Sequence, residues 1–273
     1  MKLAIIFPVL NQHTLAHAAI VTAMANVSST ENVELIVIDN ASDEPFTGHN
    51  KIVRLEKNIG VYPIFWEALK HTDADVLAFF HSDLFVAEKG FDTRIIEAFK
   101  QMINLGLLGF IGSNQIDSSG GRGLGTTSNF QGSEYEMNGK IWHGSPALVH
   151  GKAYSGYSKA AVVDGCAMIF RRTTLEDIKQ RENFPPHHFY DRLLSCEVRE
   201  LGYEVGVLGI ACDHISGQTV NQESAYHRMA NEWIKEHMDG MLTDSPDMIV
   251  YVEAERQWLE EYRDIKKLVP VII

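Results

Sequence analysis

The sequence has no long apolar run, few cysteines and no excess of basic residues. Nowhere do about 18 apolar residues follow one another, so no transmembrane helix is predicted. Only five apolar residues separate Lys2 from Pro8, too few for the core of a signal peptide. Cys166, Cys196 and Cys212 are odd in number and lack metal-site spacing, which favours reduced thiols in an intracellular, cytoplasmic protein.

Basic residues are outnumbered, because 24 Lys and Arg stand against 36 Asp and Glu, giving a net charge of -12. This balance argues against a surface built broadly for polyanions, although it leaves room for a local basic groove. The 273 residues, 45% hydrophobic and 22% charged, are ordinary for a globular protein. They allow one large α/β domain or two small ones.

One stretch organises the chain, an apolar run from Val76 to Phe80 that stops at His81, Ser82 and Asp83. Apolar residues at successive positions predict a strand buried on both faces. Open α/β sheets bind ligands at the carboxyl ends of such strands, so Asp83 is the first candidate for a metal-binding or phosphate-handling residue. An ordinary turn after the strand is the alternative.

The same sequence pattern recurs before and after this stretch: predicted strands end at polar residues and alternate with predicted helices. Such alternation predicts βαβ units, which place Pro8, Asp39, Asn58 and Asp83 along one rim of one sheet. Strands are predicted at 3–10, 33–38, 52–55, 161–172 and 203–210. Helices are predicted at 14–26, 63–69, 91–103, 175–181, 225–237 and 252–267, and Thr14 is expected to cap the first of them. A further helix contains Asp191 near its start and ends at Leu201, before Gly202.

Residues 112–160 lack any helical or strand period, and an irregular insertion of this length is usually functional or disordered. The insertion is rich in aromatic and cationic side chains, including Trp142, His143 and Tyr154, which makes it a candidate for substrate contact. A mobile surface loop is the alternative.

Candidate metal-binding and catalytic residues lie at the ends of predicted strands and at the start of a predicted helix. Asp83 and His214, both at strand ends, could together hold a divalent cation such as Mn²⁺ or Mg²⁺. Asp191 begins a helix, where it either caps the helix or acts as a general base on an attacking hydroxyl.

In their order along the chain, several motifs resemble the family-2 glycosyltransferases of the GT-A fold, inverting enzymes that use nucleotide sugars. The resemblance covers roughly residues 2–219 and leaves 220–273 as a C-terminal helical extension packed on that domain. It rests on Pro8, Asp39-Asn40-Ala41-Ser42-Asp43, Asn58-Ile59-Gly60-Val61, His81-Ser82-Asp83, Asp164-Gly165 through Arg171-Arg172, Tyr190-Asp191 with Gly202-Tyr203, and His214.

The resemblance implies a GT-A domain with a Rossmann-like, mostly parallel mixed sheet and a role for each matching residue. Asp83 and His214 correspond to metal ligands, and Asp191 corresponds to the catalytic base. The implied donor is a nucleoside-diphosphate sugar, with a UDP-sugar favoured. Residues implied to bind it are Pro8, Asn11, Asp39, Asn58, Gly60, His81, Ser82 and Gly165. Apart from the resemblance, acceptor contacts are predicted for Trp142, His143 and Tyr154 of the insertion and for His188 and Tyr190.

Two positions depart from the family pattern. His81 replaces the first aspartate of the Asp-x-Asp motif, and Tyr190 replaces the first acid of a Glu-Asp pair. Imidazole can itself bind Mn²⁺, so metal dependence is expected to survive the first change.

Two other functions are alternatives to glycosyl transfer. A nucleotidyltransferase would usually carry a glycine-rich basic loop after the first strand, but residues 8–13 contain neither glycine nor lysine. His81 and Tyr190 also suit a catalytically impaired nucleotide-sugar-binding protein. The acceptor is expected to be a glycan, with a modified nucleic-acid base as the alternative.

Overall fold

A central mixed sheet organises the computed structural model, which describes residues 1–113, 134–137, 140–143, 156–182, 184, 187 and 190–214. In these residues the sheet has eight strands, and the predicted α/β architecture is confirmed. In spatial order they are β10 (Tyr157–Lys159), β13 (Glu204–Leu208), β6 (Leu105–Gly109), β12 (Ala167–Arg171), β4 (Val76–Phe80), β1 (Leu3–Val9), β2 (Val33–Asp39) and β3 (Ile52–Arg54).

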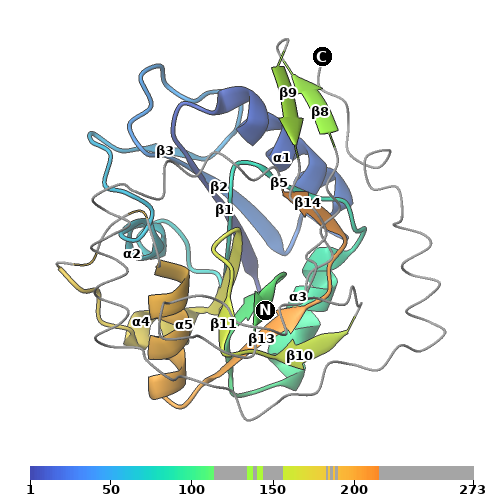
Figure 1. Cartoon of the computed structure of the whole chain (residues 1–273), viewed down its shortest axis with the longest axis vertical. Helices are drawn as coiled ribbons and strands as arrows, with labels where there is room; N and C mark the ends of the chain where they lie inside the picture. The colour runs from blue at the N-terminus through green and yellow to red at the C-terminus, as the bar shows by residue number, and fades with distance from the viewer. Residues whose placement is uncertain are drawn as a thin grey trace.

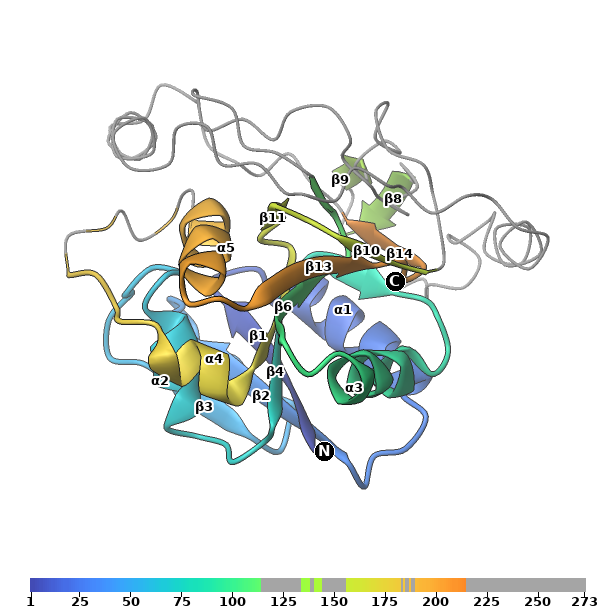
Figure 2. The same cartoon turned by 90° about the horizontal axis from the view of Figure 1, so that it is seen from below.

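Helices cover both faces of the sheet, as Figure 2 shows. Successive side chains of a strand point to opposite faces, so Leu3, Ile5 and Phe7 of β1 join one core while Ala4 and Ile6 join the other. The first core packs against α1 (His13–Asn26) and α3 (Phe91–Gln101), and the second against α2 (Ile64–Leu69), α4 (Arg172–Asp177) and α5 (Tyr190–Glu200).

The strands β4, β1, β2 and β3 run parallel, so their carboxyl ends share one edge. The chain goes from β1 to β2 on one side, while β4 lies on the other, which makes β1 and β4 a topological switch point. The last pair between β1 and β4 is Ile6 with Phe79. Pro8, which has no backbone donor, lies beyond that pair, where the two strands have parted.

A short two-stranded sheet carries His214 to the same edge. β5 (Leu84–Val86) follows Asp83 and pairs antiparallel with β14 (Cys212–His214), and His214 lies opposite Leu84 (Figure 1). Asp83 therefore becomes a neighbour of a residue far along the chain.

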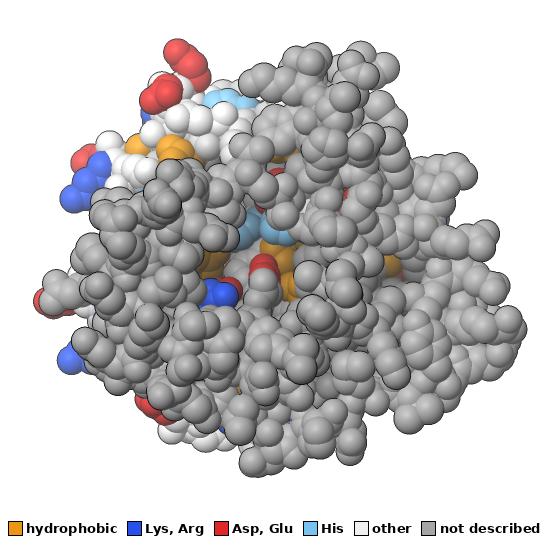
Figure 3. Space-filling view, in the orientation of Figure 1, with side chains coloured by type: hydrophobic (Ala, Val, Ile, Leu, Met, Phe, Trp, Pro, Cys, Tyr) orange, Lys and Arg blue, Asp and Glu red, His pale blue; other side chains and the backbone are white. Residues whose placement is uncertain are grey.

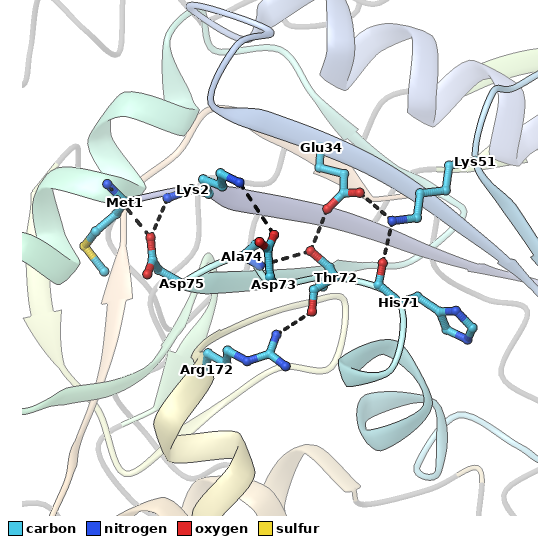
Figure 4. A network of polar contacts seen from close by, with 10 residues as sticks. All are labelled: Met1, Lys2, Glu34, Lys51, His71, Thr72, Asp73, Ala74, Asp75 and Arg172. Carbon is cyan, nitrogen blue, oxygen red and sulfur yellow. Dashed lines mark hydrogen bonds and ion pairs between the residues drawn. The ribbon is translucent and has the colours of Figure 1, made fainter.

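Polar contacts clamp the opposite end of the sheet (Figure 4). The carboxylate of Asp75 accepts a hydrogen bond from Lys2 N at 2.7 Å, and Glu34 accepts from Thr72 at 2.6 Å. Arg172 donates to the Thr72 carbonyl at 2.6 Å. These contacts tie together the amino ends of β1, β2 and β4, on the side of the sheet away from the loops at the carboxyl edge.

Several local predictions were wrong. Thr14 is not the helix cap, because α1 begins at His13 and Gln12 makes no side-chain capping hydrogen bond. The strand predicted at 161–172 is broken at Asp164 into β11 (Val162–Val163) and β12. The insertion is not wholly irregular, since it contains β7 (Gly112–Ser113), β10 and the hairpin β8 (Glu134–Met137) with β9 (Lys140–His143).

The helices predicted at 225–237 and 252–267, and the domain boundary near 219, lie outside the described residues and stay predictions. All three cysteines are buried and form no disulfide within the part of the chain that the structure describes, as expected of reduced thiols. Among the helices that the structure describes, none combines the length and apolar character needed to cross a membrane.

Candidate active site

Three metal-ligating side chains meet at the carboxyl edge. His81 follows β4, Asp83 precedes β5 and His214 ends β14. Nε2 of His214 lies 3.2 Å from Oδ1 of Asp83, and Nδ1 of His81 lies 3.9 Å from the same oxygen. One donor atom from each residue fits within 4.8 Å of the others. Histidine and acidic side chains are visible together near the centre of this face in Figure 3.

Asp83 and His214 shift each other toward the charged forms. Burial alone would raise the pKa of Asp83, but the hydrogen bond and charge of His214 bring it below its usual value. Burial would likewise lower the pKa of His214, and Asp83 raises it above its usual value. His81 differs, because burial lowers its pKa and Asp83 only partly opposes this. The surroundings thus favour an ion pair between Asp83 and His214 and disfavour a charge on the His81 imidazole.

The cluster fits a divalent cation by the chemistry of its donors. Two imidazoles and one carboxylate form a set that Mn²⁺ and other first-row transition metals accept, whereas Mg²⁺ prefers oxygen ligands. A bound cation would displace the proton of His214, because ligand imidazoles are neutral. The sequence predicted Asp83 and His214 in this role, and the structure places His81 beside them.

Tyr190 contacts the cluster through His81. The Tyr190 hydroxyl lies 2.8 Å from Nε2 of His81, and the phenol is only 6% exposed. Gly165 makes room for it, since a Cβ at that position would lie 2.5 Å from the hydroxyl oxygen. Gly165, predicted to bind the nucleotide sugar, therefore has a steric role in seating Tyr190.

Asp191 occupies the first turn of α5 next to Tyr190 and is 9% exposed. Its Oδ1 accepts a hydrogen bond from the backbone N–H of Arg192 at 2.9 Å and lies 3.7 Å from the Arg192 guanidinium. Its charge acts on both Tyr190 and His81, so the carboxylate is near the cluster. Asp191 is thereby oriented by its own helix at the rim of the site.

A hydrogen-bond network joins the loops that follow β1 and β2. Asn11 N donates to the Ser42 hydroxyl at 3.0 Å, and the Asn11 side chain exchanges hydrogen bonds with Asp43 at 2.8 and 3.1 Å. Ser82 extends the network to β4, donating to the side chain of Gln12 at 3.1 Å. The two loops and the end of β4 thus form one ordered rim.

Asn40, buried at 4% exposure, continues the rim to the loop after β3. Its side chain donates to Asn58 at 2.9 Å and accepts from Ile59 N at 3.0 Å. Gly60 N donates to the Asn58 side chain at 2.8 Å. Of the predicted nucleotide residues, Asn58 and Gly60 are therefore held in place by Asn40, which lies in the predicted motif 39–43 but to which the sequence assigns no role.

Two residues in these loops have left-handed backbone conformations, Asn11 at φ 58° and Ala41 at φ 63°. Asparagine tolerates this region, but alanine adopts it at a cost of roughly 1 kcal/mol or more. The Ser42, Asp43 and Asn40 contacts on either side hold the strained turn. Strain of this kind clusters at ligand-binding sites.

The side chain of Asp39 makes its hydrogen bonds within the protein. Its carboxylate is fully buried and accepts hydrogen bonds from Ser42 N at 2.8 Å, Phe46 N at 3.0 Å and Arg54 at 2.5 Å. Burial alone would raise its pKa, but these hydrogen bonds bring the pKa below its usual value. The carboxylate shapes the β2–β3 loop, so its predicted contact with nucleotide gains no direct support from this geometry.

Replacing Arg54 by methionine is expected to lower the free energy of unfolding by about 1 to 2 kcal/mol, because the buried Asp39 carboxylate loses its cation. The guanidinium is 41% exposed, which keeps the loss at the low end. Since the folded pKa of Asp39 is lowered, its stabilisation is present above the unfolded pKa of roughly 4 and is lost as pH falls through the folded value. In urea unfolding, the free energy of unfolding of Arg54→Met should therefore lie below that of wild type by an amount that becomes smaller between about pH 7 and about pH 3.

The matched control for this change is Lys70→Met, which removes an exposed partner of Glu67. It should cost less than about 0.5 kcal/mol at either pH. A loss in Arg54→Met that is the same at both pH values would contradict the role assigned to Asp39.

The acceptor residues predicted from the sequence are only partly described. Trp142 and His143 fall on β9, and Tyr154 and His188 lie outside the described residues, so their acceptor contacts stay predictions. Tyr190 is described, and its hydroxyl is engaged with His81. Sequence reasoning missed the roles of Ser42 and Arg54, for which the only signal was their position beside Asp39 and at the end of β3.

The chain belongs to the glycosyltransferase-like family, because its sequence matches that family over residues 4–243. The resemblance to glycosyltransferases is thereby confirmed. No curated protein sequence matches the chain.

Solved glycosyltransferase structures share the fold. GalNAc-T7 with UDP, GalNAc and Mn²⁺ has a TM-score of 0.61 at 11% identity, with 86% of this chain and 48% of that chain covered. TarS 1–349 from S. aureus with UDP-GlcNAc has a TM-score of 0.50 at 18% identity, with 81% and 60% covered. The fold is therefore of the GT-A type. This chain spans 48 to 60% of the length of these two proteins.

Proposed function

We propose that this protein transfers a sugar, with inversion, from a nucleoside-diphosphate sugar to an acceptor hydroxyl. The observation that carries the proposal is the meeting of a cation-binding cluster, His81, Asp83 and His214, with the helix-borne carboxylate of Asp191 at the switch-point edge. Family membership supports the reaction class. The solved complexes with UDP and UDP-GlcNAc support the donor class, and UDP is the favoured nucleotide.

The reaction is a single displacement at the anomeric carbon. Asp191 takes the proton of the acceptor hydroxyl, and the acceptor oxygen forms a bond to that carbon. The bond between the carbon and the diphosphate oxygen breaks, and its electron pair leaves with the nucleoside diphosphate. Asp83 and His214, with His81 beside them, would hold a divalent cation, which would supply positive charge to neutralise the departing diphosphate.

The ordered rim binds the nucleotide in this proposal. Asn11, Asn58 and Gly60 line the pocket for the base and ribose, together with Pro8 at the point where β1 and β4 part. Asp39 acts through the loop that it shapes, holding the turn at Ala41 and Ser42 against Asn11. Ser82 lies between the rim and the metal cluster, where the diphosphate is expected.

The donor set predicts a preference for Mn²⁺ over Mg²⁺, since two of its three ligands are imidazoles. At about 100 times its dissociation constant, Mn²⁺ should raise the melting temperature by roughly 5 to 10 °C, whereas an equal Mg²⁺ concentration should give less than about 2 °C. Differential scanning fluorimetry after chelator treatment measures both shifts. Equal stabilisation by the two ions would contradict the assignment of both histidines as ligands.

A screen of nucleotide sugars in the presence of Mn²⁺ tests the function itself. Added thermal stabilisation identifies the donor, and hydrolysis or transfer of its sugar demonstrates catalysis. Stabilisation by a nucleotide sugar with neither hydrolysis nor transfer would instead favour a binding protein. The proposed acceptor is a glycan, with a modified nucleic-acid base as the alternative, and acceptor trials with the best donor separate the two.

A further inference from the structure

The two positions that depart from the family pattern contact each other. His81 and Tyr190 are 109 residues apart in the sequence, yet His81 Nε2 and the Tyr190 hydroxyl oxygen are 2.8 Å apart. The resemblance places a carboxylate at each of these positions. Two carboxylates at hydrogen-bonding distance repel one another, whereas an imidazole and a phenol attract. The two replacements therefore work as a pair.

His81 links this pair to the metal-ligating cluster through its other nitrogen. Nδ1 lies 3.9 Å from Oδ1 of Asp83, and the ring centroids of His81 and His214 are 5.6 Å apart. One ring nitrogen of His81 thus contacts Tyr190 while the other lies on the side of the cluster. A ligand imidazole is neutral and carries a single N–H, so a bond from Nδ1 to a cation requires the hydrogen on Nε2.

We propose that Tyr190 is a positioning residue whose hydroxyl accepts the Nε2–H of His81 and so presents Nδ1 as a third cation ligand beside Asp83 and His214. This inference rests on the cation site of the proposed function. Partners of this kind fix the tautomer and ring orientation of metal-binding histidines.

Three elements hold the phenol where this role requires it. Tyr190 is the first residue of α5, and its ring packs on Phe65 of α2 with centroids 5.8 Å apart. Between β11 and β12, Gly165 leaves the space that the hydroxyl occupies, 2.5 Å from where a Cβ would stand. A phenol held by its helix, by ring packing and by a close-fitting glycine is suited to orienting an imidazole.

The test is Mn²⁺ binding to the full chain without any nucleotide sugar, measured by electron paramagnetic resonance of the free ion. Tyr190→Phe keeps the ring and removes only the hydroxyl, and it should weaken Mn²⁺ binding by about 10-fold or more. Tyr203→Phe is the matched control, because it removes a hydroxyl bound to Asp177 at an exposed position. The control should leave the affinity unchanged.

A double-variant comparison shows whether Tyr190 acts through His81. Adding Tyr190→Phe to His81→Ala should change Mn²⁺ affinity by less than about two-fold, because the residue that Tyr190 orients is already absent. Additive losses would overturn the positioning role. Nitrogen-15 NMR of metal-free wild type gives a second readout, in which His81 should be the Nε2–H tautomer.

The outcomes distinguish this inference from the proposed function. Wild-type Mn²⁺ affinity in Tyr190→Phe, or an Nδ1–H tautomer of His81 in the wild type, overturns the inference even if sugar transfer is found. A wild type that binds no Mn²⁺ also overturns it. Loss of Mn²⁺ binding in Tyr190→Phe supports the inference even if no nucleotide sugar is turned over.

Discussion

Asp83→Asn is expected to reduce Mn²⁺-dependent sugar transfer by about 10³-fold, which corresponds to roughly 4 kcal/mol of transition-state stabilisation. Asp83 is the only carboxylate among the three clustered side chains, and its Oδ1 lies 3.2 Å from Nε2 of His214 and 3.9 Å from Nδ1 of His81. Asparagine keeps the shape of the side chain but removes the negative charge. Steady-state transfer rates across a range of Mn²⁺ concentrations measure the effect.

The loss should appear both as weaker Mn²⁺ binding and as a lower rate at saturating Mn²⁺. The first follows from the missing charge, and the second from poorer placement of the cation against the diphosphate. Nucleotide affinity without metal should change little, because the hydrogen bonds described above for the rim loops do not involve Asp83.

Asp92→Asn is the matched control for this change. Asp92 is also buried, at 3% exposure compared with 8% for Asp83, but it accepts a hydrogen bond from Ser28 N before β2, at the amino ends of the parallel strands. This variant should lose stability without losing metal dependence. If Asp83→Asn kept wild-type transfer and the same Mn²⁺ dependence, the metal site would be assigned to the wrong residues.

The sequence predicted the parallel half of the sheet well because β1, β2 and β4 are buried on both faces. A strand covered by helices on both sides has apolar residues at every position, and that signal is local. β6 was missed because Gly106 and Gly109 interrupt its apolar run. Both glycines are required by neighbours far along the chain, since a Cβ would lie 2.7 Å from Tyr203 at Gly106 and 2.6 Å from Val163 at Gly109.

Residues of the candidate site could be predicted from the sequence only where the end of a strand determines their position by itself. Asp83 and His214 could be placed at one rim from the strand pattern and the family resemblance. The pairing of β5 with β14, which brings them to 3.2 Å, depends on tertiary contact between two three-residue strands that have little signal of their own. The contact of His81 with Tyr190 is of the same kind, because nothing within either local segment indicates it.

Asp39 shows that a residue can be placed correctly at a strand end from the sequence while its role stays undetermined. A carboxylate at a strand end has the same sequence signature whether it faces a ligand or the protein interior. Both carboxylate oxygens of Asp39 accept hydrogen bonds from within the protein. The donors are Ser42 N, Phe46 N and the guanidinium of Arg54, at the end of the neighbouring strand. Sequence patterns therefore located the rim but could not assign which of its polar groups are structural.

Asp191→Asn is expected to lower the transfer rate by about 10² to 10⁴-fold, the range in which general bases contribute. The amide cannot take the proton of the acceptor hydroxyl, but it preserves the size of the side chain and its hydrogen bond from Arg192 N. Donor affinity should stay within about two-fold of wild type, because Asp191 touches none of the rim loops in the described residues. Isothermal titration of the donor and single-turnover transfer measure the two quantities separately.

Two further variants make this result specific. Asp191→Glu retains a carboxylate but moves it by one methylene, so an intermediate loss indicates that the position of the base matters as well as its charge. Asp177→Asn removes a carboxylate that binds the Tyr203 hydroxyl at the surface, and it should leave transfer unchanged. Near-wild-type transfer by Asp191→Asn would remove Asp191 as the base. In that case Asp164, whose charge also acts on His81 and Tyr190, becomes the next carboxylate to test, because it precedes Gly165 on the turn that seats the phenol.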